Sequence, residues 1–84
     1  MATKLSRSGK TLPASASGPS VIAEAVRSAR HRHGLTQSDL AGLSGTGLRF
    51  VSELERGKPN VVLSKVVAVL AALGLRLEVR GDAP

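Results

Sequence analysis

Five small or aliphatic residues at a fixed spacing constrain the fold of this 84-residue chain more than any other feature: Leu40, Ala41, Gly45, Val51 and Leu54. Ala41 is small enough for two helices to touch at a steep angle, and Gly45, four residues later, suits a turn that needs positive φ. Val51 and Leu54 follow six and nine residues after that glycine, where a second helix must be anchored to the core. This register predicts two short helices joined by a tight turn.

Local signals define the ends of the two helices and support a helix-turn-helix over residues 35–57. Thr36 and Asp39 have the spacing of a capping box, in which each side chain accepts a hydrogen bond from the other residue's backbone amide. The first helix should therefore begin after Thr36. Its inward-facing residues are expected to be Leu40, Ala41 and Leu43. Gly57, with a proline two residues later, is a typical stop signal for the second helix.

Helical periodicity predicts one further helix on each side of this motif. From an expected N-cap at Ser20, apolar residues recur at helical spacing to about His33, where Gly34 can end the helix. After the motif, a fourth helix is expected from about Leu63 until Gly74 stops it. Its apolar stripe consists of Leu63, Val66, Val67, Leu70 and Leu73. The chain is therefore expected to be mainly α, with four helices.

Four segments are expected along the chain: a disordered basic arm at 1–19, the helical domain at 20–74, a strand at 75–80 and a tail at 81–84. Residues 75–80 alternate apolar and charged side chains, which is strand periodicity. Because no other segment has this pattern, the expected pairing partner is the same strand of a second copy, giving a homodimer. The interface residues of that homodimer would be Leu75, Leu77 and Val79. The alternative is that the fourth helix simply continues and frays.

The net charge of +6, from 12 Lys and Arg against 6 Asp and Glu, favours a polyanionic partner. Charge alone does not single out DNA, because residues 1–19 carry +3 whereas residues 35–60 are neutral. The arm is basic, rich in Ser and free of acidic residues, which also resembles a transit peptide. No apolar run is long enough to cross a bilayer, so a cytoplasmic protein without a membrane partner is expected.

The sequence lacks the residue patterns of catalysis and of metal binding. The chain has no cysteine, which excludes disulfides and thiolate metal sites. His31 and His33 stand two residues apart, without the spacing of a zinc site. Gly42, Gly45 and Gly47 lack the lysine and the flanking strand of a phosphate-binding loop. We therefore expect no enzymatic activity, no metal and no cofactor.

Two stretches carry a resemblance to a known family: GLTQSDLA at residues 34–41 and VSELERGK at residues 51–58. They resemble the Xre family of lambdoid phage repressors, and the resemblance extends over about residues 20–74. It implies a lambda-repressor-like four-helix DNA-binding domain. The strand expected at 75–80, in place of that family's fifth helix, resembles the HipB-like antitoxins, in which such strands pair across a dimer.

The resemblance implies a sequence-specific transcriptional repressor that binds double-stranded DNA. A palindromic operator is expected, because a two-fold symmetric dimer reads two half-sites. The HipB-like features imply an antitoxin that represses its own operon and binds a HipA-type kinase toxin. Two alternatives remain, a free-standing Xre-type repressor and a helix-turn-helix adaptor that binds proteins without binding DNA.

The second helix of the motif is expected to enter the major groove and to present to the bases the residues that point away from the core. These are Gly47, Leu48, Arg49, Ser52 and Glu53. Arg49 is the strongest candidate, because a guanidinium can donate two hydrogen bonds to guanine. The Xre family usually has Ser or Thr where this chain has Gly47, and more often a polar residue where it has Leu48. Few base contacts are therefore expected.

Contacts with backbone phosphates are expected from Arg30, Gln37, Ser38, Thr46 and Lys58. Gln37 and Ser38 lie at the start of a helix, where free amides and the helix dipole attract anions. Gln37 also matches a phosphate-contacting position of the phage repressors. The resemblance further implies a structural ion pair between Arg30 and Glu55 that orients Arg30 toward phosphate. The alternative is that both are solvated surface charges.

Overall fold

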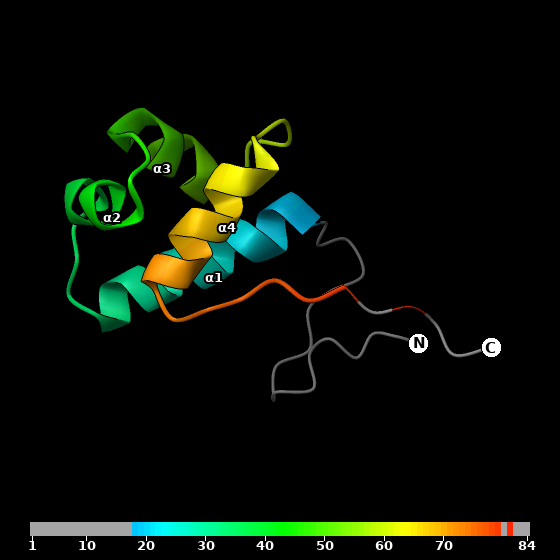
Figure 1. Cartoon of the computed structure of the whole chain (residues 1–84), viewed down its shortest axis with the longest axis horizontal. Coiled ribbons are helices and arrows are strands. Elements are labelled where there is room, and N and C mark those ends of the chain that lie inside the picture. The colour runs from blue at the N-terminus through cyan, green and yellow to red at the C-terminus, as the bar shows by residue number, and fades with distance from the viewer. Residues whose placement is uncertain (1–17, 80, 82–84) are drawn as a thin grey trace.

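The computed structural model describes residues 18–79 and residue 81, and in this part of the chain it contains four α-helices and no β-strand. The helices are α1 (Gly18–Arg32), α2 (Gln37–Ser44), α3 (Leu48–Glu55) and α4 (Leu63–Ala72). In Figure 1, α4 crosses in front of α1, while α2 and α3 lie together beside this pair. The prediction of a mainly α, four-helix domain is confirmed.

The first helix begins earlier than predicted. α1 starts at Gly18, so Ser20 is an exposed residue within the first turn and its prediction as the N-cap is wrong. Pro19 explains the earlier start, because a proline in the first turn has a suitable φ and lacks only an amide that would have no helical partner. The predicted arm at 1–19 thus overlaps α1 by two residues, and the rest of it lies outside the described residues.

The helix-turn-helix forms through the local signals that predicted it. Thr36 caps α2, and both hydrogen bonds of the capping box with Asp39 are present, at 2.9 Å and 3.0 Å. Gly45 has a φ of 73° and ends α2, its amide turning back toward the last carbonyls of the helix. Gly47 then caps α3 without a side-chain bond. The predicted capping box and the positive-φ turn are confirmed.

One hydrophobic core joins all four helices. α2 packs against both α3 and α4, and α1 packs against α3. The buried core residues are Val26, Ala29, Leu40, Ala41, Val51, Leu54, Val66, Val69, Leu70 and Leu73. Because α2 has neighbours on two sides, its leucine Leu40 is fully inaccessible to solvent.

Three aliphatic residues that the periodicity placed inward face solvent instead: Leu43, Leu63 and Val67. The side of α2 that faces the core lies between Leu40 and Ala41. Because each residue advances the helix by about 100°, Leu43 lies roughly a third of a turn away from that side. Leu43 is therefore 65% exposed. In α4 the buried residues are Val66, Val69 and Leu70, so the core side includes Val69, which the predicted stripe omitted.

The predicted strand at 75–80 does not form within the single chain. Residues 75–79 follow the positive-φ Gly74 without helix or strand geometry, and residue 80 lies outside the described residues. A strand needs a second strand to satisfy its backbone groups, and residues 18–79 contain none. Leu75 packs against the core, whereas Leu77 and Val79 are exposed.

None of the helices in the described part of the chain has the length and apolarity to span a membrane.

Candidate nucleic-acid interface

The solvent side of α3, together with its C-cap residue, carries a stripe of polar side chains that we call the reading face: Arg49, Ser52, Glu53 and Arg56. Their spacing of three, four and seven residues places them on one side of the helix. Val51, Leu54 and Glu55 occupy the opposite side and are buried. α3 is thus anchored by one side and presents the other, where the Arg49 side chain is 90% exposed.

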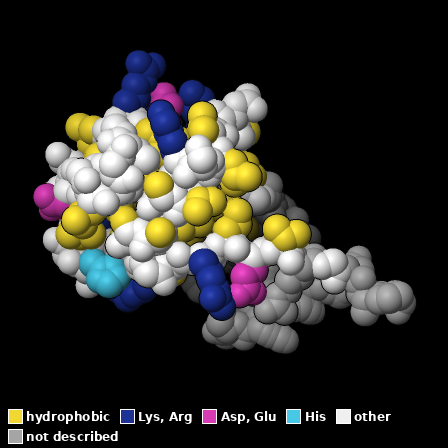
Figure 2. Space-filling model, viewed as in Figure 1, with side chains coloured by type: hydrophobic (Ala, Val, Ile, Leu, Met, Phe, Trp, Pro, Cys, Tyr) yellow, Lys and Arg dark blue, Asp and Glu magenta, His cyan; other side chains and the backbone are white. Residues whose placement is uncertain are grey.

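Ion pairs connect the reading face to the turn that follows α3. Arg49 Nε donates to Glu53 Oε2 at 3.3 Å, and Lys58 Nζ donates to Glu53 Oε1 at 3.2 Å. The hydrogen bond from Lys58, and then that from Arg49, lowers the pKa of Glu53 despite some desolvation. Arg56 Nη1 donates to Ser52 Oγ at 3.0 Å. Basic side chains surround an acidic one over α3 at the top of Figure 2.

A buried carboxylate ties α1, α2 and α3 together behind the reading face. Glu55 Oε2 accepts from Arg30 Nε at 2.6 Å, and Glu55 Oε1 accepts from Arg30 Nη2 at 2.9 Å and from Gln37 Nε2 at 3.1 Å. The side chains of Arg30 and Glu55 are only 12% and 3% exposed. The structure therefore brings together the two residues whose pairing the family resemblance implied.

Charge and burial oppose each other at this carboxylate. Burial by itself raises the pKa of Glu55, but the hydrogen bonds from Arg30 and Gln37 outweigh it, so the pKa lies below its ordinary value. The same bond to Glu55 raises the pKa of Arg30. Because Arg30 Nη1 also donates to the carbonyl of Leu35 at 2.8 Å, most of the Arg30 guanidinium is engaged inside the protein.

The other residues expected at phosphates occupy different settings around α2. Gln37 is half-buried and directed at Glu55, whereas Ser38 beside it is exposed at the first turn of α2. Thr46 lies in the turn, with its hydroxyl 2.8 Å from that of Ser44. Lys58 follows α3 and is held by Glu53. At the start of α3, Leu48 is exposed and Gly47 adds no side chain.

Two arginines in this region were missing from the sequence prediction. Arg56 lies on the reading face, and extending the spacing from Arg49 by seven residues would have found it. Arg27, one turn before Arg30, donates to the backbone carbonyl of Glu55 and pairs with Glu24 at 3.3 Å. The first contact joins residues far apart in the sequence, so no local pattern indicates it.

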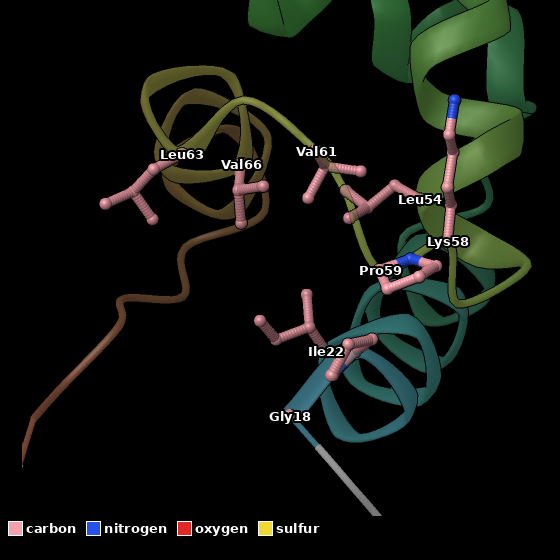
Figure 3. Close-up of a pocket in the computed structure, with 9 residues that line it drawn as sticks. Gly18, Ile22, Leu54, Lys58, Pro59, Val61, Leu63 and Val66 are labelled. Carbon is pink, nitrogen blue, oxygen red and sulfur yellow. The ribbon is translucent and has the colours of Figure 1, made fainter.

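An apolar groove of about 200 Å³ lies where the start of α1, the loop after α3 and the start of α4 meet. Ile22, Leu54, Val61 and Val66 contribute aliphatic walls, as Figure 3 shows. Lys58 lines its edge, but the side chain points away from the groove in Figure 3, in agreement with its bond to Glu53.

The described residues include no group of three or more acidic or histidine side chains that could hold a metal ion.

Comparison with known proteins supports the same motif. A family model described as a helix-turn-helix domain matches residues 21–82. A relative from Sinorhizobium fredii (strain NBRC 101917 / NGR234), named "Uncharacterized HTH-type transcriptional regulator y4mF", is 43% identical over 61 residues, which cover 73% of this chain and 80% of the relative. "Control protein C.SmaI" of Serratia marcescens is 38% identical over 53 residues, which cover 63% of each protein.

A solved structure is also similar to this chain in fold. The protein named "MDT Protein" is 27% identical and has a TM-score of 0.70, with coverage of 80% of this chain and 94% of that chain. The family model spans most of the chain, including all of α2, α3 and α4. The chain therefore belongs to the helix-turn-helix domain family.

Proposed function

We propose that this chain is a transcriptional regulator of the repressor type that binds double-stranded DNA by placing α3 in the major groove. The observation that carries the proposal is the reading face, where Arg49 projects from a helix whose other side is locked into the core. A guanidinium at that position can donate to guanine O6 and N7. The relatives named as a transcriptional regulator and a control protein support the same role.

Contacts to the DNA backbone would come from both sides of the reading face. On one side, the first turn of α2 presents free amides beside the exposed Ser38. On the other side, Lys58 follows α3 and is partly exposed. Binding of this kind requires neither catalysis nor a cofactor, and the proposal includes neither.

Replacing Arg49 by alanine tests the proposal on duplex DNA. Wild-type affinity should fall steeply with salt. For each phosphate contact, the logarithm of the association constant should fall by about 0.9 when the salt concentration rises tenfold. Arg49→Ala should cost about 1–3 kcal/mol on the preferred sequence and should relax discrimination at one base pair, because it removes a base contact. Fluorescence anisotropy with duplexes selected from a randomised library measures both quantities.

Two results would contradict these assignments. The proposed DNA binding would be contradicted if wild-type protein bound no duplex at low salt, or if its binding did not depend on salt. Either result would favour a protein-binding adaptor. An equal loss on all sequences would instead reassign Arg49 to phosphate contact. Arg32→Ala is a matched control, since it removes an exposed arginine from the end of α1 and is expected to leave sequence preference unchanged.

The regulator is proposed to act as a homodimer in which segment 75–80 pairs with that of a second copy. Support comes from the alternation of exposed apolar Leu77 and Val79 with Arg76 and Glu78, a pattern suited to an intermolecular strand. The narrower role of a HipB-like antitoxin rests on this segment alone. Co-purification of a kinase-like protein with the chain would support that role.

Charging the two exposed apolar residues of this segment should weaken dimerisation. Leu77→Lys combined with Val79→Lys leaves the core untouched but places four like charges at the two-fold interface, so the dimer dissociation constant should rise at least about tenfold. Sedimentation equilibrium measures this constant. Leu43→Lys, a similar change on α2, should leave it unaltered. An unchanged mass for the double variant would refute the paired segment.

A further inference from the structure

Glu53 is the only acidic side chain on the reading face, and each of its carboxylate oxygens is bonded to a different cation. Oε2 accepts from Arg49 Nε at 3.3 Å and Oε1 accepts from Lys58 Nζ at 3.2 Å. Glu53 itself is the least accessible of the three, with an 18% exposed side chain against 90% for Arg49 and 46% for Lys58. The carboxylate thus lies between the two basic groups, slightly behind them.

The local backbone maintains this arrangement. Arg49 and Glu53 are four residues apart on α3, so their side chains are neighbours on the helix surface. Gly57, with a φ of 81°, reverses the chain after α3. The amide of Lys58 then donates to the carbonyl of Glu53 at 3.2 Å, which brings the Lys58 ammonium back to the carboxylate. Main chain and side chain therefore both hold Lys58 beside Glu53.

The charge of Glu53 matters more here than the strength of its bonds. Exposed ion pairs contribute little to stability, so DNA could displace either cation at small cost. A carboxylate brought against a phosphate or a base acceptor, by contrast, meets a like-charge or acceptor–acceptor repulsion. In the major groove, guanine and thymine present acceptors, and adenine presents its N6 amino group next to the N7 acceptor. Cytosine presents the N4 amino group without an acceptor beside it, so a carboxylate can accept from it without repulsion.

We infer that Glu53 is a specificity-determining residue, which opposes non-specific contact by Arg49 and Lys58 and favours sites that offer a cytosine amino group beside the base read by Arg49. The inference rests on the proposed DNA-binding function and assigns a distinct role within it. On DNA without the matched site, the basic side chains of this surface can still contact phosphates, which every sequence offers: Arg49, Arg56 and Lys58. Glu53 lowers the affinity for DNA of arbitrary sequence more than the affinity for a site with the cytosine amino group, so that site is favoured.

Glu53→Gln in the full chain tests this role, because it removes the charge and keeps the shape. The variant should bind a synthetic duplex of arbitrary sequence about tenfold more tightly than wild type, with a salt slope steeper by about one, as for one added phosphate contact. Sequencing of duplexes selected from a randomised library should show that a cytosine preference present with wild type is lost. Glu53→Asp, which retains the charge, should keep the arbitrary duplex weakly bound.

Glu24→Gln is the matched control, since Glu24 pairs with Arg27 at the same 3.3 Å but lies on α1. It changes the net charge equally and should alter affinity for the arbitrary duplex by less than about twofold, because distant surface charges are screened. Equal effects of the two variants, or wild-type-like binding by Glu53→Gln, would overturn the role of Glu53 while leaving DNA binding intact. Wild-type protein that binds no duplex would overturn both.

Discussion

Replacing Glu55 by alanine is expected to lower the free energy of unfolding by about 3 kcal/mol, because breaking a buried ion pair leaves its partner uncompensated. The Glu55 side chain is 3% exposed and accepts hydrogen bonds from Arg30 and Gln37. Without it, the Arg30 guanidinium loses its counterion at the junction of three helices. Urea denaturation followed by circular dichroism measures the difference.

Glu24→Ala provides the matched control for this prediction. Glu24 also pairs with an arginine, but both side chains are about half exposed, at 54% and 43%. Exposed pairs of this kind contribute about 0–1 kcal/mol, so the control should lose little stability. Similar losses in the two variants would show that Glu55 acts as an ordinary surface charge.

The same carboxylate gives the stability of the protein a pH dependence of known sign. The pKa of Glu55 is lower in the folded protein than its ordinary value of 4.5. The stability that it contributes is therefore fully present above the unfolded pKa and is lost as the pH falls through the folded one. Asp39 and Glu53 also have lowered pKa values, so Glu55→Gln isolates the share of Glu55. Below pH 4.5, wild type should lose stability more steeply than this variant.

Replacing Leu40 by alanine is expected to cost about 2–5 kcal/mol of unfolding free energy. Leu40 is fully buried, and α2, on which it lies, packs against both α3 and α4. The cavity left by the missing atoms would be lined by aliphatic side chains held on rigid helices, which can close it only in part. Thermal or urea unfolding of the purified variant gives the value.

Leu43→Ala is the control on the same helix, one turn further along. The chemical change is identical, but Leu43 is 65% exposed, so the loss should stay within about 0.5 kcal/mol. A comparable loss at Leu43 would indicate that this side chain is covered in solution, for example by a second copy of the chain. The pair of variants thus also reports on the orientation of α2.

Features that depend on a few neighbouring residues could be predicted without the tertiary structure. The capping box joins Thr36 and Asp39 across three residues, and Gly45 and Gly57 meet a local need for positive φ. The anchoring of α3 by Val51 and Leu54 also followed from spacing within one helix. Arg49 was expected on the outer side of α3 for the same reason, and it lies there.

Features that depend on how the helices are rotated relative to one another could not be predicted from the sequence. Periodicity treats Leu43 and Val67 as equivalent to buried positions, and only the direction of the neighbouring helices decides that they face solvent. Spacing placed Gln37 at the start of α2, but its amide turns toward Glu55, eighteen residues later. Residues 75–79 form no strand in the single chain for a related reason, since alternation describes side chains and supplies no pairing partner.

The sequence by itself determined a four-helix domain with a helix-turn-helix, because caps, turns and helical spacing act within a few residues of the chain. Only the tertiary structure decided which polar groups meet. It placed the Glu55 carboxylate between Arg30 and Gln37. It also brought the Lys58 ammonium within hydrogen-bond distance of Glu53, which also accepts from Arg49. Such contacts depend on the relative positions of whole helices and turns, which core packing sets and no local pattern encodes.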